Sequence, residues 1–115
     1  MEDQRLHKDD GKVPYELLSV EALAQIAKVM AYGRNKYKAH GWREGIAWSR
    51  IIGSSMRHLT AFLDGEDNDP ESGLPHLAHL GCDVMFLLEY AKTHPELDDR
   101  YSTLQKVQKY EETRQ

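Results

Sequence analysis

The segment LGCDVMFLLEYA, residues 80–91, most restricts how this chain can fold, because it is apolar on nearly every side. A helix with apolar side chains all round must be covered by other elements. Pro75 suits the first turn of such a helix, where its missing N–H is not needed, and Pro95 follows its end. We therefore predict a central, buried helix from Pro75 to about Thr93.

Three further segments carry apolar side chains at spacings of three and four residues, the pattern of amphipathic helices. They run from Val20 to about Tyr37, from about Ala47 to Leu63, and from about Glu96 to the C-terminus. Gly65 and the acidic segment GEDNDPESGLP predict a loop between the second and third helices. No segment alternates as a strand would, so the predicted fold is all-α, a small bundle of about four helices.

A length of 115 residues predicts a single domain, residues 1–115, in which the polar residues 1–13 form a loose arm. So short a chain buries only about two-thirds of its unfolded surface as a monomer. The apolar stripes on the first and last helices exceed what a small bundle can bury internally. We therefore expect a homodimer or a homotetramer to complete the bundle.

Charge and apolar content exclude several classes of protein. A formal net charge of −4 argues against a nucleic-acid polymer as partner. The apolar stretches are far shorter than the about 20 residues that span a membrane, and the charged N-terminus lacks a secretory signal. Cys82 is the only cysteine, which fits the cytoplasm, and we interpret it as a small buried hydrophobe rather than a nucleophile.

Polar side chains nonetheless gather where the second and third predicted helices meet. His76, His79 and Asp83 lie along one face of the third helix, because they are three and four residues apart. If the two helices pair antiparallel across the short loop, His58 lies at a comparable depth on the second helix. Such clusters are how helix bundles build metal sites, and the alternative is that these side chains are satisfied structural residues.

The loop between these helices adds further candidate metal ligands. Glu66, Asp67 and Asp69 offer the carboxylate oxygens that hard divalent cations prefer. The loop does not fit an EF-hand, because Ser72 and Ala78 stand where that motif has glycine and glutamate. The chain also lacks the P-loop, nucleophile-elbow and paired-cysteine motifs, which excludes those kinds of site.

Two groups of side chains are candidates for binding a substrate. Arg50 and Arg57 are seven residues apart and share a helix face, and with Lys36 they are candidates for binding phosphate. Trp42 and Trp48 flank the connector before the second helix. They are suited either to stack on a base or to cover the end of the bundle.

Three segments of the chain together resemble the dATP/dGTP diphosphohydrolase family of phages, in its N-terminal domain. They are GKVPYELLSVEALAQIAKVMAYGRNKY, GWREGIAWSR and MRHLTAFLDGEDNDPESGLPHLAHLGCDVMFLL. That family is associated with phages that replace adenine by 2-aminoadenine, and the most specific part of the resemblance is GEDNDPESGLPHLAH. The family looks related to the all-α nucleotide pyrophosphohydrolases of the MazG type, which hold magnesium through E-x-x-E and E-x-x-D helices. Asp83 matches the aspartate of the second pattern, whereas Leu80 and His58 stand where glutamates would be expected.

The resemblance implies hydrolysis of dGTP or dATP to the monophosphate and pyrophosphate, in the cytoplasm of an infected cell. It also implies a divalent metal, Mg²⁺ if carboxylates hold it and Mn²⁺ or another transition metal if histidines are ligands. The residues assigned to the metal are Glu66, Asp67, Asp69, His79 and Asp83. The residues assigned to ligand or general-base roles are His58, His76 and His79. Arg57 is assigned to the phosphates.

Two alternatives stay open at the level of sequence. One is a metal phosphohydrolase of the HD type acting on nucleotides, although the adjacent His-Asp pair of that family is absent from this chain. The other is a non-catalytic helical binding module whose histidines are structural.

Overall fold

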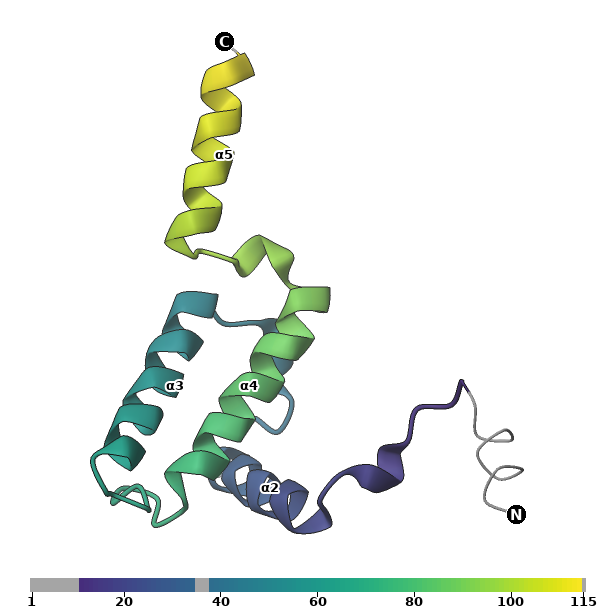
Figure 1. The fold of residues 1–115 in the computed structure, drawn as a ribbon, viewed down its shortest axis with the longest axis vertical. Coiled ribbons are helices and arrows are strands. Elements are labelled where there is room, and N and C mark those ends of the chain that lie inside the picture. The colour runs from purple at the N-terminus through teal and green to yellow at the C-terminus, as the bar shows by residue number, and fades with distance from the viewer. Residues whose placement is uncertain (1–10, 35–37, 115) are drawn as a thin grey trace.

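The structure, a computed structural model, describes residues 11–34 and 38–114. Four α-helices follow one another in these residues (Figure 1): α2 (Val20–Arg34), α3 (Trp48–Leu63), α4 (His76–Thr93) and α5 (Tyr101–Arg114). The short 3-10 helices are η1 (Tyr15–Leu17), η2 (Gly41–Glu44) and η3 (Pro95–Leu97). No strand occurs among the described residues, and the predicted all-α bundle is confirmed.

α4 is the central helix, as predicted, because it packs on α3 along one side and on α2 along another. Figure 1 shows α3 and α4 side by side and antiparallel, with α2 behind the lower end of α4. Gly81 permits the close approach of α2, since a Cβ at this position would lie 2.9 Å from Cδ1 of Ile26. The core between α2 and α4 consists of Val29, Ala78 and Cys82, with Ile26, Met30, Leu74 and Phe86 packed against them.

Cys82 is a buried small hydrophobe, in agreement with the interpretation from sequence. Its side chain lies in the core, with Sγ 3.3 Å from Sδ of Met30. Burial raises the pKa of the thiol to about 12. The thiol therefore stays protonated near neutral pH and is a poor nucleophile.

One face of α4 departs from the prediction that this helix is covered on every side. Leu77, Val84 and Leu88 are 49%, 46% and 72% exposed. Within the described residues α3 and α2 pack along α4, Trp42 of η2 stacks on Phe86, and η3 contacts the C-terminal end of the helix. The apolar character of this face is therefore not explained by packing among the described residues.

Gly65 ends α3 as predicted. Its φ of 97° places it in the left-handed region, where a residue without a Cβ is favoured. The backbone N–H of Gly65 donates to the carbonyl of Phe62, and that of Glu66 donates to the carbonyl of Ala61, so these two carbonyls of the last turn are satisfied. This sharp stop turns the chain back toward the start of α4.

The prediction of one helix from Glu96 to the C-terminus is wrong, because the chain breaks between η3 and α5. Asp99 turns away to accept hydrogen bonds from the backbone N–H and the hydroxyl of Ser49, at 2.8 and 2.6 Å. Asp98 instead accepts from Arg100 and Thr103 and thereby fixes the start of α5. α5 then extends away from the bundle in Figure 1, so Leu104 and Val107 stay exposed rather than packing on the core.

The first predicted helix agrees with α2 over the described residues. The hydroxyl of Ser19 accepts a hydrogen bond from the N–H of Ala22, so Ser19 caps the start of the helix. α2 is described as far as Arg34, and residues 35–37, where the predicted helix ended, lie outside the described residues. No α-helix in the described part of the chain combines the length and apolarity that crossing a membrane requires.

The two glycines Gly65 and Gly33 give a matched test of the helix stop. A Cβ at either position would meet no atom within 4 Å, but only Gly65 has a positive φ. We expect Gly65→Ala to lower the free energy of unfolding by about 1 kcal/mol, the cost of a left-handed backbone for alanine. Gly33→Ala, inside α2, should raise it by about 0.5–1 kcal/mol. Urea denaturation measures the free energy of unfolding of both variants. Equal changes in the two variants would contradict the claim that the positive φ of Gly65 is what requires glycine there.

Candidate functional site

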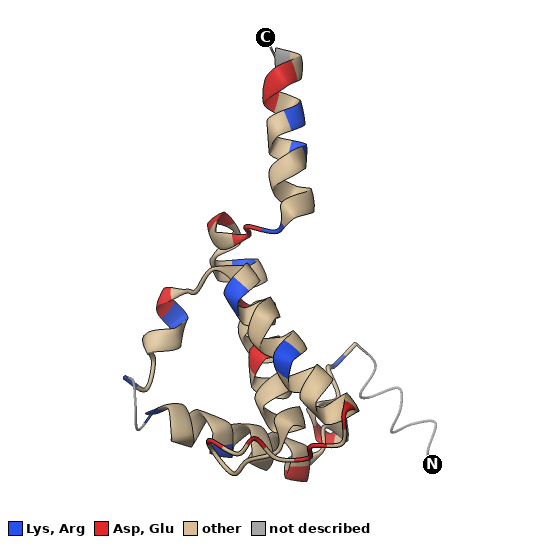
Figure 2. Ribbon diagram, turned by 90° about the vertical axis from the view of Figure 1, so that its left-hand side faces the viewer, with Lys and Arg blue, Asp and Glu red and all other residues tan. Residues whose placement is uncertain are grey.

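The loop between α3 and α4 is held by its own hydrogen bonds. The N–H of Asp69 donates to the carbonyl of Leu74 at 2.8 Å, and that of Gly73 donates back to Asp69 at 2.7 Å. The N–H of His76 donates to the carbonyl of Asp67 at 2.9 Å, which joins the loop to the first residue of α4. Figure 2 shows the acidic positions that this loop carries. The loop therefore holds its carboxylates at the N-terminal end of α4.

Three histidines meet beneath this loop, as the sequence predicted. His58 comes from α3, and His76 and His79 come from the first turn of α4. The rings of His58 and His79 are stacked, with centroids 4.6 Å apart and planes 7° apart. Nδ1 of His58 lies 2.9 Å from Nδ1 of His76. His76 is buried and the other two are half-buried, so imidazole nitrogens are concentrated at one end of the hairpin.

Asp69 completes a group of three possible metal ligands with His58 and His79. One ligand atom from each residue lies within 4.8 Å of the others. Oδ2 of Asp69 is 4.0 Å from Nδ1 of His58 and 3.9 Å from Nε2 of His79. Metal–nitrogen and metal–oxygen bonds of about 2.1 Å require shorter separations, so the side chains would draw inward on binding. Two imidazoles and one carboxylate are a donor set that suits a first-row transition metal.

The local environment prepares Asp69 and His79 for this role. Oδ1 of Asp69 accepts from the N–H of Glu71 at 2.8 Å, which directs Oδ2 toward the histidines. Burial is the largest cause that lowers the pKa of His79, followed by repulsion from His58, whereas Asp69 acts in the opposite direction. A lowered pKa favours the neutral imidazole, which is the form that binds a metal.

Glu66 and His76 form a chain of polar contacts that ends at His58. Nε2 of His76 lies 2.6 Å from Oε1 of Glu66, and its Nδ1 contacts His58. With Glu66 ionised, His76 donates from Nε2 to the carboxylate and accepts at Nδ1 from His58. This tautomer leaves the lone pair on Nε2 of His58, where it can bind a metal or accept a proton. Glu66 thus contacts a histidine rather than the group of three ligands.

Asp83 lies further along α4, on the side that faces α3. It is 8% exposed, and Ser55 of α3 lies 3.4 Å from its Oδ2. Burial raises the pKa of Asp83, while hydrogen bonds from Ser54 and Ser55 and the charges of His58 and Arg57 oppose that shift. Asp83 does not belong to the group of three ligands, and the side chain of Asp67 is exposed in the loop.

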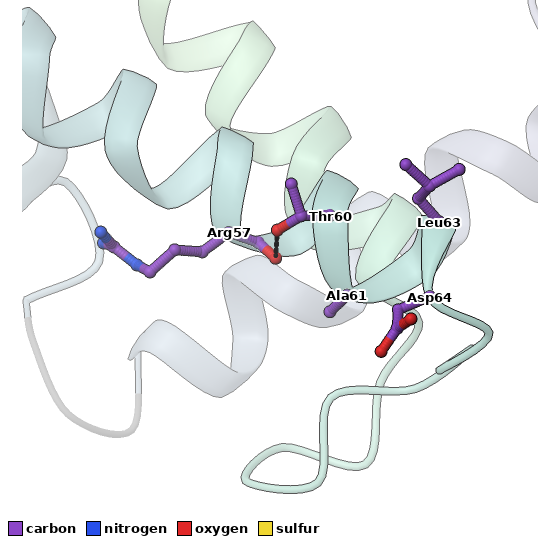
Figure 3. A pocket seen from close by; sticks show the side chains of 5 residues that line it. All are labelled: Arg57, Thr60, Ala61, Leu63 and Asp64. Atoms are coloured by element: carbon purple, nitrogen blue, oxygen red, sulfur yellow. Dashed lines mark hydrogen bonds between the residues drawn. The ribbon is translucent and has the colours of Figure 1, made fainter.

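Arg57, one of the predicted phosphate-binding residues, lies on the outer side of α3. Arg57 lines an open depression of about 480 Å³ with Thr60, Ala61, Leu63 and Asp64, and none of the three histidines lines it (Figure 3). The guanidinium of Arg57 folds back along the helix, so that a Cβ on Gly53 would lie 3.2 Å from Nη1.

The other substrate candidates lie elsewhere. Arg50 is exposed near the start of α3, and Lys36 lies outside the described residues. Trp42 stacks on Phe86 at 4.8 Å between centroids, and the guanidinium of Arg43 lies 4.5 Å from the centre of its ring. Arg100 lies 5.1 Å from the ring centre of Trp48. Both tryptophans thus pack at the end of the bundle distant from the histidines.

Comparison with known proteins identifies the family. A sequence model described as "dATP/dGTP diphosphohydrolase, N-terminal" matches residues 2–100. The chain belongs to this family. It is 33% identical over 92 residues to the dATP/dGTP diphosphohydrolase of Salmonella phage PMBT28, which covers 80% of this chain and 31% of the relative. The chain therefore spans about a third of that relative's length, and no solved structure matches it.

The family match includes every residue of the histidine cluster, but sequence reasoning missed two serines of the site. Oγ of Ser72 lies 2.7 Å from Nε2 of His79 and accepts from the N–H of Leu74 at 3.1 Å. Ser72 was recognised only as the residue that breaks an EF-hand pattern. Ser55, which lies beside Asp83, is not among the residues that the sequence predicts for the site. Its position three residues before His58 was the available signal, because that spacing places the two side chains on one face of the helix.

The raised pKa of Asp83 predicts a stability that depends on pH. Because the ionised form is disfavoured in the folded protein, stability is lost as pH rises from the ordinary carboxyl pKa of 3.8 toward the raised value. We expect Asp83→Asn to raise the free energy of unfolding at pH 7 by about 1 kcal/mol, with the gain disappearing below about pH 3. Chemical denaturation across pH measures this difference.

The control for this measurement is Asp64→Asn at the exposed end of α3, which should change stability by less than about 0.5 kcal/mol. A lower free energy of unfolding for Asp83→Asn than for the unaltered chain at pH 7 would show that the ionised Asp83 stabilises the fold. That result would contradict the prediction that burial disfavours the ionised carboxylate.

Proposed function

We propose that this chain takes part in the metal-dependent hydrolysis of dGTP or dATP to the monophosphate and pyrophosphate. The observation that carries the proposal is the cluster of His58, Asp69 and His79, which lies inside the segment shared with the dATP/dGTP diphosphohydrolase family. The name of the relative from Salmonella phage PMBT28 supports a purine deoxynucleotide as substrate. The proposed setting is the cytoplasm of an infected cell.

The three residues fit a divalent metal by the chemistry of their donor atoms. His58 and His79 offer imidazole nitrogens and Asp69 offers a carboxylate oxygen, all within 4.8 Å of one another. Magnesium prefers oxygen ligands, whereas two imidazoles shift the preference toward manganese, iron, cobalt, nickel or zinc. We therefore favour a transition metal over the magnesium that carboxylate ligands alone would suggest. Three protein ligands leave further coordination positions for water and phosphate oxygens.

The proposed reaction is attack of water on the α-phosphorus. A new bond forms from the water oxygen to the α-phosphorus, the bond from the α-phosphorus to the bridging oxygen breaks, and pyrophosphate leaves. A bound divalent metal neutralises phosphate charge and lowers the pKa of water. The proton of the attacking water passes to a basic group of the site that is not itself a metal ligand. His76 and Glu66 keep the ring of His58 in place through the 2.9 Å and 2.6 Å contacts.

The substrate phosphates require cationic partners, because the loop at the site is acidic. Arg57 immediately precedes His58 in α3. Its positive charge lies near enough to Asp83 to oppose the rise in the pKa of that carboxyl group. Its exposed guanidinium can turn from Gly53 toward a phosphate without breaking a buried contact. Arg50 and Lys36 remain candidates for further phosphate contacts, and Trp42 and Trp48 for the base.

The test of the reaction is a panel of dGTP, dATP and pyrimidine triphosphates with Mn²⁺, Co²⁺, Zn²⁺, Mg²⁺ or EDTA. We expect monophosphate and pyrophosphate from the purine nucleotides, and none with EDTA. His79→Ala should lower the rate by about 100-fold or more, because a metal ligand is lost. His40→Ala, an exposed histidine outside the cluster, should leave the rate unchanged. Chromatography resolves the products, and activity that survives in His79→Ala would contradict the assignment.

The metal site can be tested without any activity. We expect the chain to bind Co²⁺ and to give visible absorption bands typical of nitrogen ligation, with little competition from Mg²⁺. Asp69→Asn should weaken Co²⁺ binding by about tenfold or more, whereas Asp64→Asn, an exposed aspartate outside the cluster, should not. Equal binding of Co²⁺ by both variants, or none by the unaltered chain, would contradict a metal on these residues.

Two other functions would be recognised from the same assays. Release of triphosphate or inorganic phosphate would favour a phosphohydrolase of the HD type. Metal or nucleotide binding without cleavage would favour a binding module. The match to the phage relative covers 31% of that protein, so about two-thirds of the relative has no counterpart in this chain.

A further inference from the structure

His94 stands at the C-terminal end of α4, where three segments of the chain meet. Its Nε2 lies 2.7 Å from the carbonyl oxygen of Arg43, which belongs to η2 in the connector between α2 and α3. Its Nδ1 lies 3.0 Å from Oε2 of Glu96 in η3. The side chain of His94 is half-buried between these two partners, and it is separate from the group of three possible metal ligands.

Both partners of His94 are hydrogen-bond acceptors. A carbonyl oxygen has no proton to give, and neither has the carboxylate of Glu96 once it is ionised, as an exposed carboxyl group is near neutral pH. A neutral imidazole carries one N–H and one lone pair, so it can satisfy only one of the two contacts. The imidazolium carries an N–H on each nitrogen and satisfies both. The two contacts therefore have the geometry of a protonated histidine.

The carboxylates around His94 also favour its charged form. The hydrogen bond to the carbonyl of Arg43 is the largest cause that raises the pKa of His94, followed by the hydrogen bond to Glu96, whereas burial opposes the rise. The negative charges of Glu96 and Glu89 raise this pKa further. A positive charge is also favoured at the C-terminal end of a helix, where backbone carbonyls are left without intrahelical partners.

Two further ionisable side chains lie beside His94, one on α4 and one on η2. The ring of Tyr90 meets that of His94 edge-on, with centroids 5.7 Å apart, and burial raises the pKa of its phenol. Tyr90 therefore stays neutral near neutral pH. The guanidinium of Arg43 lies 4.5 Å from the ring centre of Trp42 and donates to His40. The carbonyl of Arg43, rather than its side chain, is thus the partner of His94.

The connector passes closely against His94 and η3. Gly45 of the connector has a φ of 100°, and a Cβ there would lie 2.5 Å from Cδ1 of Leu97 and 3.1 Å from Cγ of His94. The carbonyl of Trp42 accepts a hydrogen bond from the hydroxyl of Tyr90. Two residues of α4 thus hold successive carbonyls of the connector. One does so through a phenol that stays neutral, and the other through an imidazole whose charge depends on pH.

We propose that His94 is a pH-sensitive clamp: its imidazolium joins the connector to η3 through the carbonyl of Arg43 and the carboxylate of Glu96, and loss of its proton releases one of these two contacts. The proton passes to solvent, and the neutral ring keeps an N–H for one acceptor only. Because the pKa is raised in the folded chain, the stability from the clamp is fully present below the ordinary histidine pKa of 6.5. It is lost as the pH rises through the raised value. The proposal does not depend on the proposed catalytic function.

The test follows the ring nitrogens of His94 by ¹⁵N NMR in the unaltered 115-residue chain. We expect both nitrogens to carry protons at about pH 7, with a titration midpoint above the ordinary value of 6.5. Hydrogen exchange of Gly45 reports on the connector, because its N–H donates to the carbonyl of Trp42 at 3.2 Å. Its protection, relative to an unfolded chain at the same pH, should fall by about threefold or more between about pH 6 and about pH 8.5.

Three variants separate the clamp from other effects of pH. His94→Gln keeps one amide donor but cannot titrate, so it should abolish the pH dependence of protection at Gly45. Glu96→Gln should lower the titration midpoint of His94, because one carboxylate partner is lost. The matched control is His40→Gln, which replaces an exposed histidine of the same connector and should leave the pH dependence at Gly45 unchanged.

Three results would overturn the proposal. They are a titration midpoint of His94 at or below 6.5, protection at Gly45 that does not change with pH, or the same pH dependence in His94→Gln as in the unaltered chain. Circular dichroism shows whether each variant keeps its helices. The titration of His94 in the unaltered chain needs no variant, so it decides the matter even if every substitution is disruptive.

Discussion

The antiparallel pairing of α3 and α4 is the constraint on which the other features depend. Gly65 ends α3 with satisfied carbonyls, and the hydrogen bonds of Asp67, Asp69 and Gly73 return the chain to α4 in one defined path. This short connection places the last turns of α3 beside the first turns of α4. The ring of His58 thereby contacts the rings of His76 and His79, which lie 18 and 21 residues further along the sequence.

That pairing also explains the unusual polarity of a helix that is otherwise apolar. His76, His79 and Asp83 face α3 rather than water, and each has a partner on α3 or on the loop. Burial penalises the charged forms of His79 and Asp83, and their pKa values shift in opposite directions as a result. A neutral imidazole next to the carboxylate of Asp69 is the arrangement from which the proposed metal site follows.

The limits of the sequence-based expectations have identifiable physical causes. The helix predicted from Glu96 is broken because Asp99 bonds to the first turn of α3, a contact 50 residues away that no local pattern reveals. Glu66, Asp67 and Asp83 are close to the cluster in sequence, but Glu66 contacts His76, Asp67 contributes a carbonyl, and Asp83 lies further along α4. Trp42 is surrounded by Phe86 and Arg43, whose proximity depends on how the connector folds against α4.

By itself, the sequence determined the local features: the helical segments, the stop at Gly65, the acidic loop and the family to which the chain belongs. These follow from periodicity, backbone preference and composition, which act over a few residues. Only the tertiary structure decided which polar side chains share a site, because Asp69 reaches the histidines through the fold of its loop. It also decided which apolar residues stay exposed, since the face of α4 that carries Leu77, Val84 and Leu88 is defined by where α2 and α3 pack.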